Sequence, residues 1–287
     1  METLATVAVS IPERSVRNDI RAVKIVWQRD IIRFFRDKPR IATALIQPML
    51  YLFILGTGLS SAGSAAAGAS GNAASGLDLR TFLFPGVMSM AVLFTCFFSA
   101  GSMVWDREFG FMREMLVAPV RRSAIILGKC LGGATTGVFQ GVLVLLLAPL
   151  VGVPFTPGLI ITVLLQMSLL AFALSAVAVM IAARIRAMQS FFALMQMILM
   201  PLFFMSGALF PVGNLPAWLE VLTRIDPLTY AVDPMRKTIL AEAMPNLPIS
   251  GVTWSGWPVP TWLELAIVAA FGLIALLIAV WQFDRAD

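Results

Sequence analysis

The segment 105–122 mixes charged side chains with bulky apolar ones and reaches a proline at Pro119. If it forms a short helix, Phe109, Met112 and Leu116 would insert into an apolar groove of another protein, and the charged side chains would lie at the rim of that groove. A solvated connector is the alternative, and it explains the charges but not the exposed Phe and Met side chains. The residue types therefore predict a protein-binding segment here.

The chain lacks the commonest general base and metal ligand of proteins. It has no histidine, and its two cysteines, Cys96 and Cys130, lie in apolar runs, so neither a metal site nor a disulfide framework is expected. No G-x-x-x-x-G-K-[ST] motif is present, so we do not expect the chain to hydrolyse nucleotides. An intramembrane enzyme could use Glu220, Asp226 and Asp233, but helix caps and ion pairs account for these carboxylates better.

These residues belong to a chain with the composition of a membrane protein. Of 287 residues, 59% are hydrophobic and 13% are charged, and the mean hydropathy is +0.87, whereas soluble chains carry about 25% charged residues. About 20 uncharged residues cross a hydrocarbon core as a helix. Six stretches qualify: 41–59, 82–104, 130–153, 159–183, 187–212 and 265–283. We predict an all-α polytopic membrane protein with six transmembrane helices, and the absence of ionisable residues in these spans argues against a secondary carrier.

Basic residues are unequally shared between the two sides of this frame. With the N-terminus inside, the cytoplasmic segments hold 17 of the 21 Lys and Arg residues. The positive-inside rule then places both termini in the cytoplasm. Anionic lipids of the inner leaflet account for the pI of about 9.8, so no nucleic acid partner is needed.

Residues 1–40 form a cytoplasmic N-terminal segment ahead of the transmembrane domain 41–287. Apolar residues recur there at helical spacing, and basic residues fill the remaining arc: Val16, Ile20, Val23, Trp27, Ile31 and Phe34. This pattern is typical of an amphipathic helix lying in the membrane interface, and packing on a soluble partner is the alternative. Lys38-Pro39 should end the helix and turn the chain into the membrane.

Several features of the spans and loops carry further expectations. Residues 60–76 form a Gly/Ala/Ser-rich outer loop. Pro201, followed by Ser206-Gly207, should kink or break the fifth span, unless it is merely tolerated there. The outer segment 213–264 contains two amphipathic stretches, 216–225 and 228–241, which could dip into the membrane as half-helices. Four glutamines either bond across helices or face a substrate path: Gln47, Gln140, Gln166 and Gln196.

Three motifs along the chain point to a family. The first is Arg107-Glu108-Phe109-Gly110 followed by Arg113-Glu114-Met115-Leu116-Val117-Ala118-Pro119-Val120 and Gly128-Lys129. The second is Ser206-Gly207-Ala208-Leu209-Phe210-Pro211-Val212 followed by Leu215-Pro216, Asp226-Pro227-Leu228-Thr229-Tyr230 and Arg236. The third is Gln47-Pro48 with Tyr51-Leu52-Phe53. On a six-span frame this set resembles the ABC-2 type transporter permeases, and in particular the daunorubicin-resistance-like exporter membrane subunits, from about residue 30 to the end.

The resemblance implies one half of an exporter of the ABC-2, or type V, architecture. Two such subunits, identical or related, would pair with two separate ATP-binding subunits, which would bind ATP and Mg while this chain binds no cofactor. The helix within 1–40 would be the family's connecting helix and the loop 105–122 its coupling helix. The coupling residues would be Arg107, Glu108, Phe109, Gly110, Met112, Arg113, Glu114, Leu116 and Pro119.

By the same resemblance, the first, second and fifth spans would line the substrate path and the dimer interface. The candidate path residues are Gln47, Tyr51, Phe94, Phe97, Phe98, Gln196, Phe203 and Phe204. A lipid-facing or packing role is the alternative for each phenylalanine. We expect a non-catalytic permease of the bacterial plasma (inner) membrane that exports an amphiphilic drug or lipid. Export of a lipid-linked glycan or polysaccharide and an intramembrane lipid-modifying enzyme are the alternative functions.

Overall fold

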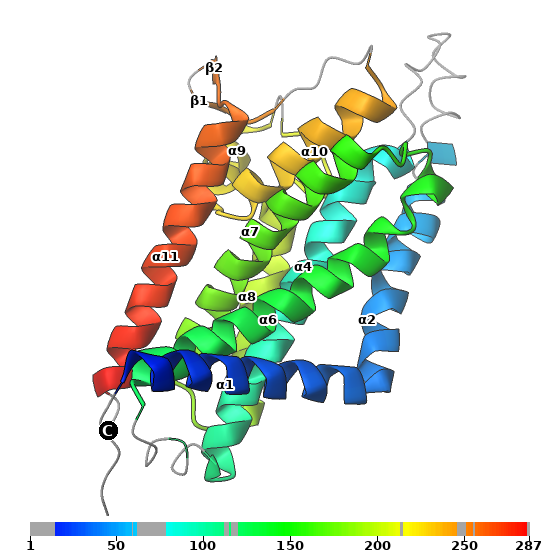
Figure 1. The fold of residues 1–287 in the computed structure, drawn as a ribbon. Coiled ribbons are helices and arrows are strands. Elements are labelled where there is room, and N and C mark those ends of the chain that lie inside the picture. Colours follow the sequence, from blue (N-terminus) through cyan, green and yellow to red (C-terminus); the bar gives the residue numbers. More distant parts are fainter. Residues whose placement is uncertain are drawn as a thin grey trace, which may run out of the picture.

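The computed structural model describes residues 15–58, 60–61, 79–111, 115, 120–212, 215–245, 251–254 and 256–285, and most of them are helical. Long helices run side by side, and one helix, α1 (Val16–Arg36), lies across one end of the bundle (Figure 1). We call this the α1 end. The opposite end carries the short helix α10 (Thr229–Ala243), and we call it the α10 end. The predicted all-α fold is confirmed.

Within the described ranges, five helices are long and apolar enough to cross a membrane. The first joins α2 (Lys38–Leu50) to the π-helix η1 (Tyr51–Leu55), and the others are α4 (Leu79–Glu108), α7 (Pro157–Ala182), α8 (Met188–Met205) and α11 (Thr261–Arg285). A sixth long helix, α6 (Arg122–Leu145), packs against α4 and α7. It includes several glycines, Lys129 and Gln140 and is not among those five apolar candidates. Six long helices therefore stand where six spans were predicted.

The amphipathic helix predicted ahead of the first span is α1, but its buried face differs from the predicted stripe. Val26, Asp30 and Phe34 are buried on the side that packs against α6. Val16 and Ile20, at the start of the stripe, are 68% and 66% exposed. Of the three buried residues only Phe34 belongs to the predicted stripe, and the membrane-interface role predicted for the stripe stays a prediction.

The predicted turn between α1 and the first span is confirmed. Asp37 leaves the helical conformation, with φ −89° and ψ 66°, and its side chain accepts a hydrogen bond from the N–H of Arg40 at 3.4 Å. Pro39 lies in the first turn of α2, where a missing N–H costs nothing. The chain thus turns sharply from α1 into α2 (Figure 1).

Pro48 explains why α2 needs a partner on α6. Proline has no N–H, so the carbonyl of Ala44, four residues earlier, loses its helical hydrogen bond. The side-chain amide of Gln140 donates to this carbonyl oxygen at 3.1 Å. Similarly, Gln166 on α7 donates to the hydroxyl of Thr238 on α10 at 3.1 Å. Bonding across helices, one of the two roles expected of these glutamines, is confirmed for both.

The third predicted span has the wrong boundaries. α6 begins at Arg122 rather than Cys130, and it ends at Leu145, ahead of the 3-10 helix η2 (Ala148–Val151). The early start places Lys129 inside the helix, although the sequence placed it in a cytoplasmic loop. The helix tolerates this lysine because two buried carboxylates pair with it.

The fifth predicted span also ends early. α8 continues through Pro201 and stops at Met205, so the expected interruption of the fifth span is found four residues after Pro201 rather than at it, and a kink at Pro201 stays a prediction. The helix ends instead at Ser206-Gly207, where Gly207 has a φ of 68°, a conformation that side chains disfavour. Beyond it, the backbone of Ala208 crosses α4 so closely that a Cβ on Gly86 would collide with it.

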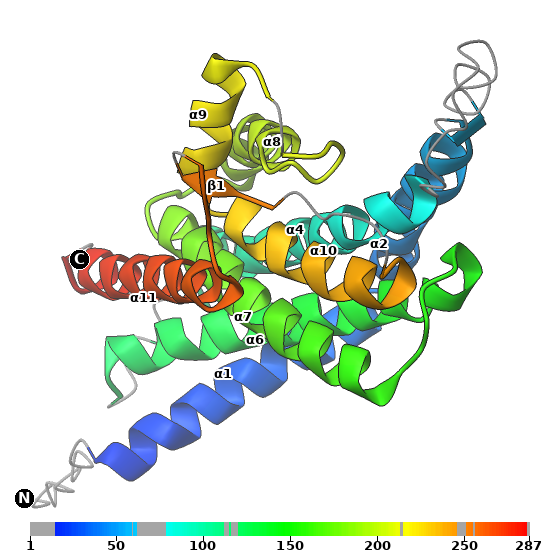
Figure 2. The ribbon, with the colours of Figure 1, turned by 90° about the horizontal axis from the view of Figure 1, so that it is seen from above.

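The two short helices predicted in the outer segment are confirmed as α9 (Ala217–Ile225) and α10. α10 packs against α4, α7 and α11, and α9 lies beside α8 (Figure 2). A small antiparallel hairpin that the sequence did not predict, β1 (Thr253–Trp254) with β2 (Trp257–Pro258), precedes α11. The Trp254 indole donates to the Tyr230 hydroxyl at 3.1 Å, which attaches this hairpin to α10.

α4 occupies the centre of the fold. It lies among α2, α6, α7, α8 and α10 and contacts each of them (Figure 2). Most of its side chains are buried. α6 and α7 pack closely against it and against each other. The packing is looser on the face of α4 that looks toward α2 and α8, and a cavity lies there.

Candidate functional site

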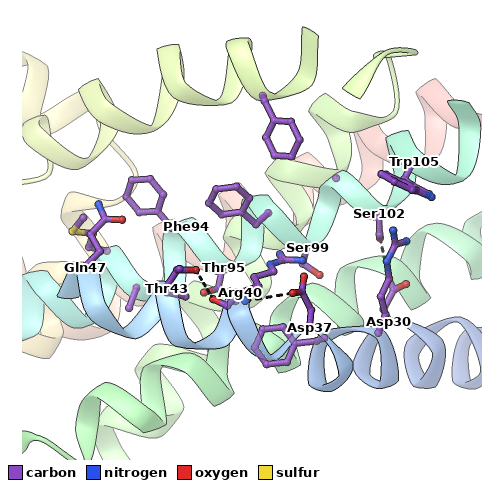
Figure 3. Close-up of a pocket in the computed structure, with 18 of the residues that line it drawn as sticks. Asp30, Asp37, Arg40, Thr43, Gln47, Phe94, Thr95, Ser99, Ser102 and Trp105 are labelled. Carbon is purple, nitrogen blue, oxygen red and sulfur yellow. Dashed lines mark hydrogen bonds between the residues drawn. The ribbon is translucent and has the colours of Figure 1, made fainter. Parts of the chain in front are cut away.

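A cavity of about 530 Å³ lies near the α1 end, between the last turns of α1, most of α2, α4 and the start of α8 (Figure 3). Its lining on α4 runs from Met90 to Trp105, which spans about 22 Å at 1.5 Å per residue. The ionisable lining residues gather toward Trp105, and the part toward Met90 is mostly apolar. The cavity is therefore amphipathic along its length.

Three of the eight predicted path residues line this cavity. They are Gln47 on α2 and Phe94 and Phe98 on α4. Phe192 on α8, which was not among the predicted path residues, adds a third ring, tilted against Phe98 with centroids 5.9 Å apart. Thr95 lies on the same wall. The structure thus brings together side chains from the first, second and fifth spans.

The other predicted path residues lie elsewhere. Tyr51 packs edge-on against Phe203, with ring centroids 6.3 Å apart. Phe97 is buried in the core between α4 and its neighbours, and Gln196 and Phe204 are exposed on α8. None of these five lines the cavity, so their participation in a path stays a prediction.

Two arginines stand over aromatic rings at the polar end of the cavity. The guanidinium of Arg40 lies 5.6 Å from the centroid of Phe98, and that of Arg33 lies 5.3 Å from Trp105. Both distances are within the range of cation–π attraction. The aromatic wall therefore fixes the position of two positive charges.

Next to these arginines, three helices contribute to a buried charge cluster, which we define as Arg29, Asp30, Asp106 and Lys129. The ammonium of Lys129 donates to Asp30 Oδ1 at 3.0 Å and lies 2.8 Å from Asp106 Oδ2. It also donates to the hydroxyl of Ser102 at 2.8 Å. Arg29 pairs with Asp106 as well. The cluster joins α1 to both α4 and α6.

Sequence reasoning missed the charge cluster, although one signal was present. Asp30 falls four residues after Val26 and four before Phe34, so it lies on the buried face of α1, where an acidic residue needs a partner. Gly132 on α6 allows this approach, because a Cβ there would come within 2.9 Å of the Cβ of Asp30. A carboxylate in an apolar stripe opposite a glycine was the clue.

The end of α4 is bonded to the connection between α7 and α8. Arg107 donates to the carbonyl oxygens of Ala183 and Ile185 at 2.6 and 3.3 Å. Glu108 accepts a hydrogen bond from the N–H of Met188, at the start of α8, at 2.9 Å. These two predicted coupling residues therefore bond within the chain.

The predicted coupling residues beyond Glu108 are described only in part. α4 gives way at Gly110, which has a φ of 85°. Phe109 and Phe111 are 57% and 50% exposed, and Phe109 rests on Trp105 with centroids 4.5 Å apart. The remaining ones lie outside the described residues: Met112, Arg113, Glu114, Leu116 and Pro119. Exposed phenylalanines at this position agree with the predicted docking role without testing it.

The α10 end holds a second group of buried charges. Arg236 is fully buried, donates to the carbonyl oxygens of Gly207 and Ala208 at 2.6 and 3.1 Å, and lies over the ring of Phe82. Burial lowers its pKa to about 10, against the opposing charge of Asp233. Arg236 thereby satisfies the carbonyl groups that follow the end of α8.

Lys237, the next residue, lies between two carboxylates. Its ammonium is 2.8 Å from Asp233 Oδ2 and 2.9 Å from Glu264 Oε1 on α11. Burial works to lower the pKa of Lys237, but the charge of Asp233 and the hydrogen bonds to both carboxylates outweigh it and raise the pKa. The ion-pair role expected of Asp233 is confirmed. Asp226 accepts a hydrogen bond from the N–H of Leu228 at 2.9 Å, which confirms the expected turn, but the N-cap of α10 is Leu228.

Comparison with known proteins places this arrangement among transporters. The profile of the ABC-2 type transporter family matches residues 21–240. The chain is 24% identical over 220 residues to the putative transport permease ycf38 of Cyanophora paradoxa, covering 76% of this chain and 73% of that protein. It is 26% identical to the inner membrane transport permease YadH of Escherichia coli, covering 75% and 81%. It is 27% identical to the probable multidrug ABC transporter permease YbhR of Escherichia coli, covering 69% and 52%.

Proposed function

The chain belongs to the ABC-2 type transporter family, and from this premise we propose that it is the permease subunit of an ATP-driven exporter of amphiphiles. Members of this family are integral membrane transport permeases, work with an ATP-binding subunit and are not themselves catalytic. In the proposal, two permeases, identical or related, pair with two ATP-binding subunits that hold ATP and Mg. The α1 end faces the cytoplasm of a bacterial cell, and the α10 end faces outward.

The amphipathic cavity is the observation that carries the proposal. Three phenylalanine rings from α4 and α8 form an apolar compartment, and charged residues of α1 and α2 stand at its other end. A compound with an apolar body and a polar head matches both parts. The name of YbhR as a probable multidrug permease supports an amphiphilic drug or lipid as cargo.

The contacts at the end of α4 support an external source of motion. Phe109 and Phe111 are exposed beside the α1 end, and burying such a side chain in a partner groove gives about 1.5–3 kcal/mol. Arg107 and Glu108 tie the same end of α4 to the α7–α8 connection. A partner that displaces the exposed segment would therefore move two walls of the cavity together.

The test is export by the complete complex of permease and ATP-binding subunit in proteoliposomes, with a fluorescent amphiphile as cargo. Thr43→Trp places an indole in the cavity, since Thr43 lines it. Thr162→Trp is the matched control, because Thr162 is also exposed and also bonds a carbonyl of its own preceding turn. We expect ATP-dependent export by the parent and the control, and little export by Thr43→Trp, with co-purification unchanged. Import, or no movement of any amphiphile despite ATP hydrolysis, would contradict the proposal.

A further inference from the structure

Arg40 has donor capacity that none of the described residues uses. It lies in the first turn of α2, at the polar end of the cavity (Figure 3). Its guanidinium lies over the ring of Phe98, and one terminal nitrogen, Nη2, is buried without an acceptor among the described residues. Buried donors without acceptors are rare in native proteins. An acceptor from outside the chain would complete the site.

Arg33 stands nearby, and its side chain is exposed rather than buried. Its guanidinium lies over the ring of Trp105, and no described side chain accepts a hydrogen bond from it. Stacking on a ring occupies the face of a guanidinium and leaves the N–H groups at its edge available. Two planar donors therefore flank the polar end of the cavity.

The carboxylates that line the cavity are already engaged. Asp30 accepts hydrogen bonds from Lys129 and Ser102 and belongs to the charge cluster, where Lys129 and Arg29 balance its charge and that of Asp106. Asp37 caps α2 through the N–H of Arg40. The charged lining residues outside the charge cluster are Arg33, Arg40 and Asp37, which carry two positive charges and one negative charge. The polar end of the cavity is therefore electropositive.

We infer that the amphiphile bound in this cavity carries an acidic headgroup, a phosphate or a carboxylate, which Arg40 and Arg33 hold while the apolar part lies against Phe94, Phe98 and Phe192. The inference rests on the proposed function and narrows its substrate class. A guanidinium matches the oxygens of these two headgroups with paired N–H donors. A cationic headgroup would be repelled here, and a neutral one would leave the buried Nη2 without a charged acceptor.

Protection of a cysteine placed in the cavity tests this inference. The variant is Ser99→Cys in the full chain, embedded in phosphatidylcholine nanodiscs and alkylated with N-ethylmaleimide. Ser99 lines the cavity, and both native cysteines are buried. The probes are dodecyl phosphate, dodecyltrimethylammonium, dodecyl maltoside and inorganic phosphate. Arg186→Cys, in the exposed connection between α7 and α8, reports any effect that does not come from the cavity.

Dodecyl phosphate should protect Ser99→Cys at about tenfold lower concentration than the other three probes. Adding Arg40→Gln should raise its half-protecting concentration by about tenfold and leave that of dodecyl maltoside unchanged. Arg17→Gln, at the exposed start of α1, is the matched control and should change neither value.

Three results would overturn the inference. Protection by dodecyltrimethylammonium at the same concentration would remove the charge preference, and equal protection by inorganic phosphate would remove the need for a tail. Equal weakening of every amphiphile by Arg40→Gln would make Arg40 a structural residue. The assay contains no ATP and no ATP-binding subunit, so a failure of the proposed exporter function appears only in the transport assay and stays distinct from these results.

Discussion

The Lys129→Met variant measures how much the charge cluster contributes to the stability of the fold. In the parent, the ammonium contacts Asp30 at 3.0 Å and Asp106 at 2.8 Å, and Arg29 supplies the second positive charge. Methionine fills a similar volume without charge or donors. The variant therefore leaves two buried carboxylates opposite Arg29 alone, and the cluster changes from neutral to one net negative charge.

The structure sets the size of the expected loss. Lys129, Asp30 and Asp106 are at most 5% exposed, so water screens little of the charge left behind. Removing one partner from a buried ion pair costs about 3–5 kcal/mol. Arg29 remains bonded to Asp106 and is itself partly exposed, which favours the lower end of this range. At about 2 °C per kcal/mol for a chain of this size, the apparent Tm should fall by about 6 °C.

The measurement is thermal unfolding of the full chain in detergent micelles, followed by tryptophan fluorescence at one scan rate. Lys24→Met is the matched control, since Lys24 is exposed on α1 and its loss should change the Tm little. Lys129→Met combined with Asp30→Asn restores neutrality and should recover at least half of the loss. Equal Tm values for Lys129→Met and Lys24→Met, or a double variant less stable than Lys129→Met alone, would refute the reasoning.

Three further predictions follow from contacts described above. Gln140→Leu leaves the carbonyl of Ala44 without a donor and should destabilise the chain by about 1–3 kcal/mol, and Pro48→Ala should rescue it by restoring a backbone N–H; thermal unfolding that shows no rescue would contradict this account. Burial raises the pKa of Asp226 to about 7 from 3.8, although a hydrogen bond from the Leu228 N–H opposes it. Because the folded pKa lies above the unfolded one, this group destabilises the fold progressively from about pH 4 to about pH 7. The Tm of Asp226→Asn minus that of the parent should therefore increase between pH 5 and pH 8. A Tm difference independent of pH would disprove the raised pKa of Asp226. Phe109→Ala should weaken co-purification of the ATP-binding subunit by about tenfold, while Phe155→Ala, similarly exposed at the other end of α6 and α7, should not; equal retention by both would remove Phe109 from the docking surface.

The long helices could be predicted because composition decides them. Runs of about 20 uncharged residues have few alternatives to a membrane helix, and the turn at Asp37, the end of α8 near Gly207 and the helices α9 and α10 follow from local signals. The boundary of α6 could not be predicted in this way. Its position depends on a charge at Lys129 that is neutralised by residues far away in the sequence.

The cavity shows the same limit. Phe97 and Phe98 are neighbours in the sequence, yet Phe97 is buried in the core and Phe98 lines the cavity. α4 is apolar on all sides, so its hydrophobic pattern contains no information about which face meets a gap. The phenylalanines could be chosen as a group from the sequence, but only the packing of α2 and α8 around α4 separates them.

The sequence separation between the residues of the charge cluster also determines when α1 can dock during synthesis of the chain. Asp30 and Lys129 are 99 residues apart, and the ribosome makes the aspartate first. At about 5–20 residues per second, about 5–20 s pass before the lysine exists. Until then, Asp30 has no ammonium to accept its charge, and α1 gains nothing by leaving water at that face. The amphipathic helix is thus made first but settles only after α6 has been synthesised, so a nascent chain that stops short of residue 129 keeps α1 undocked.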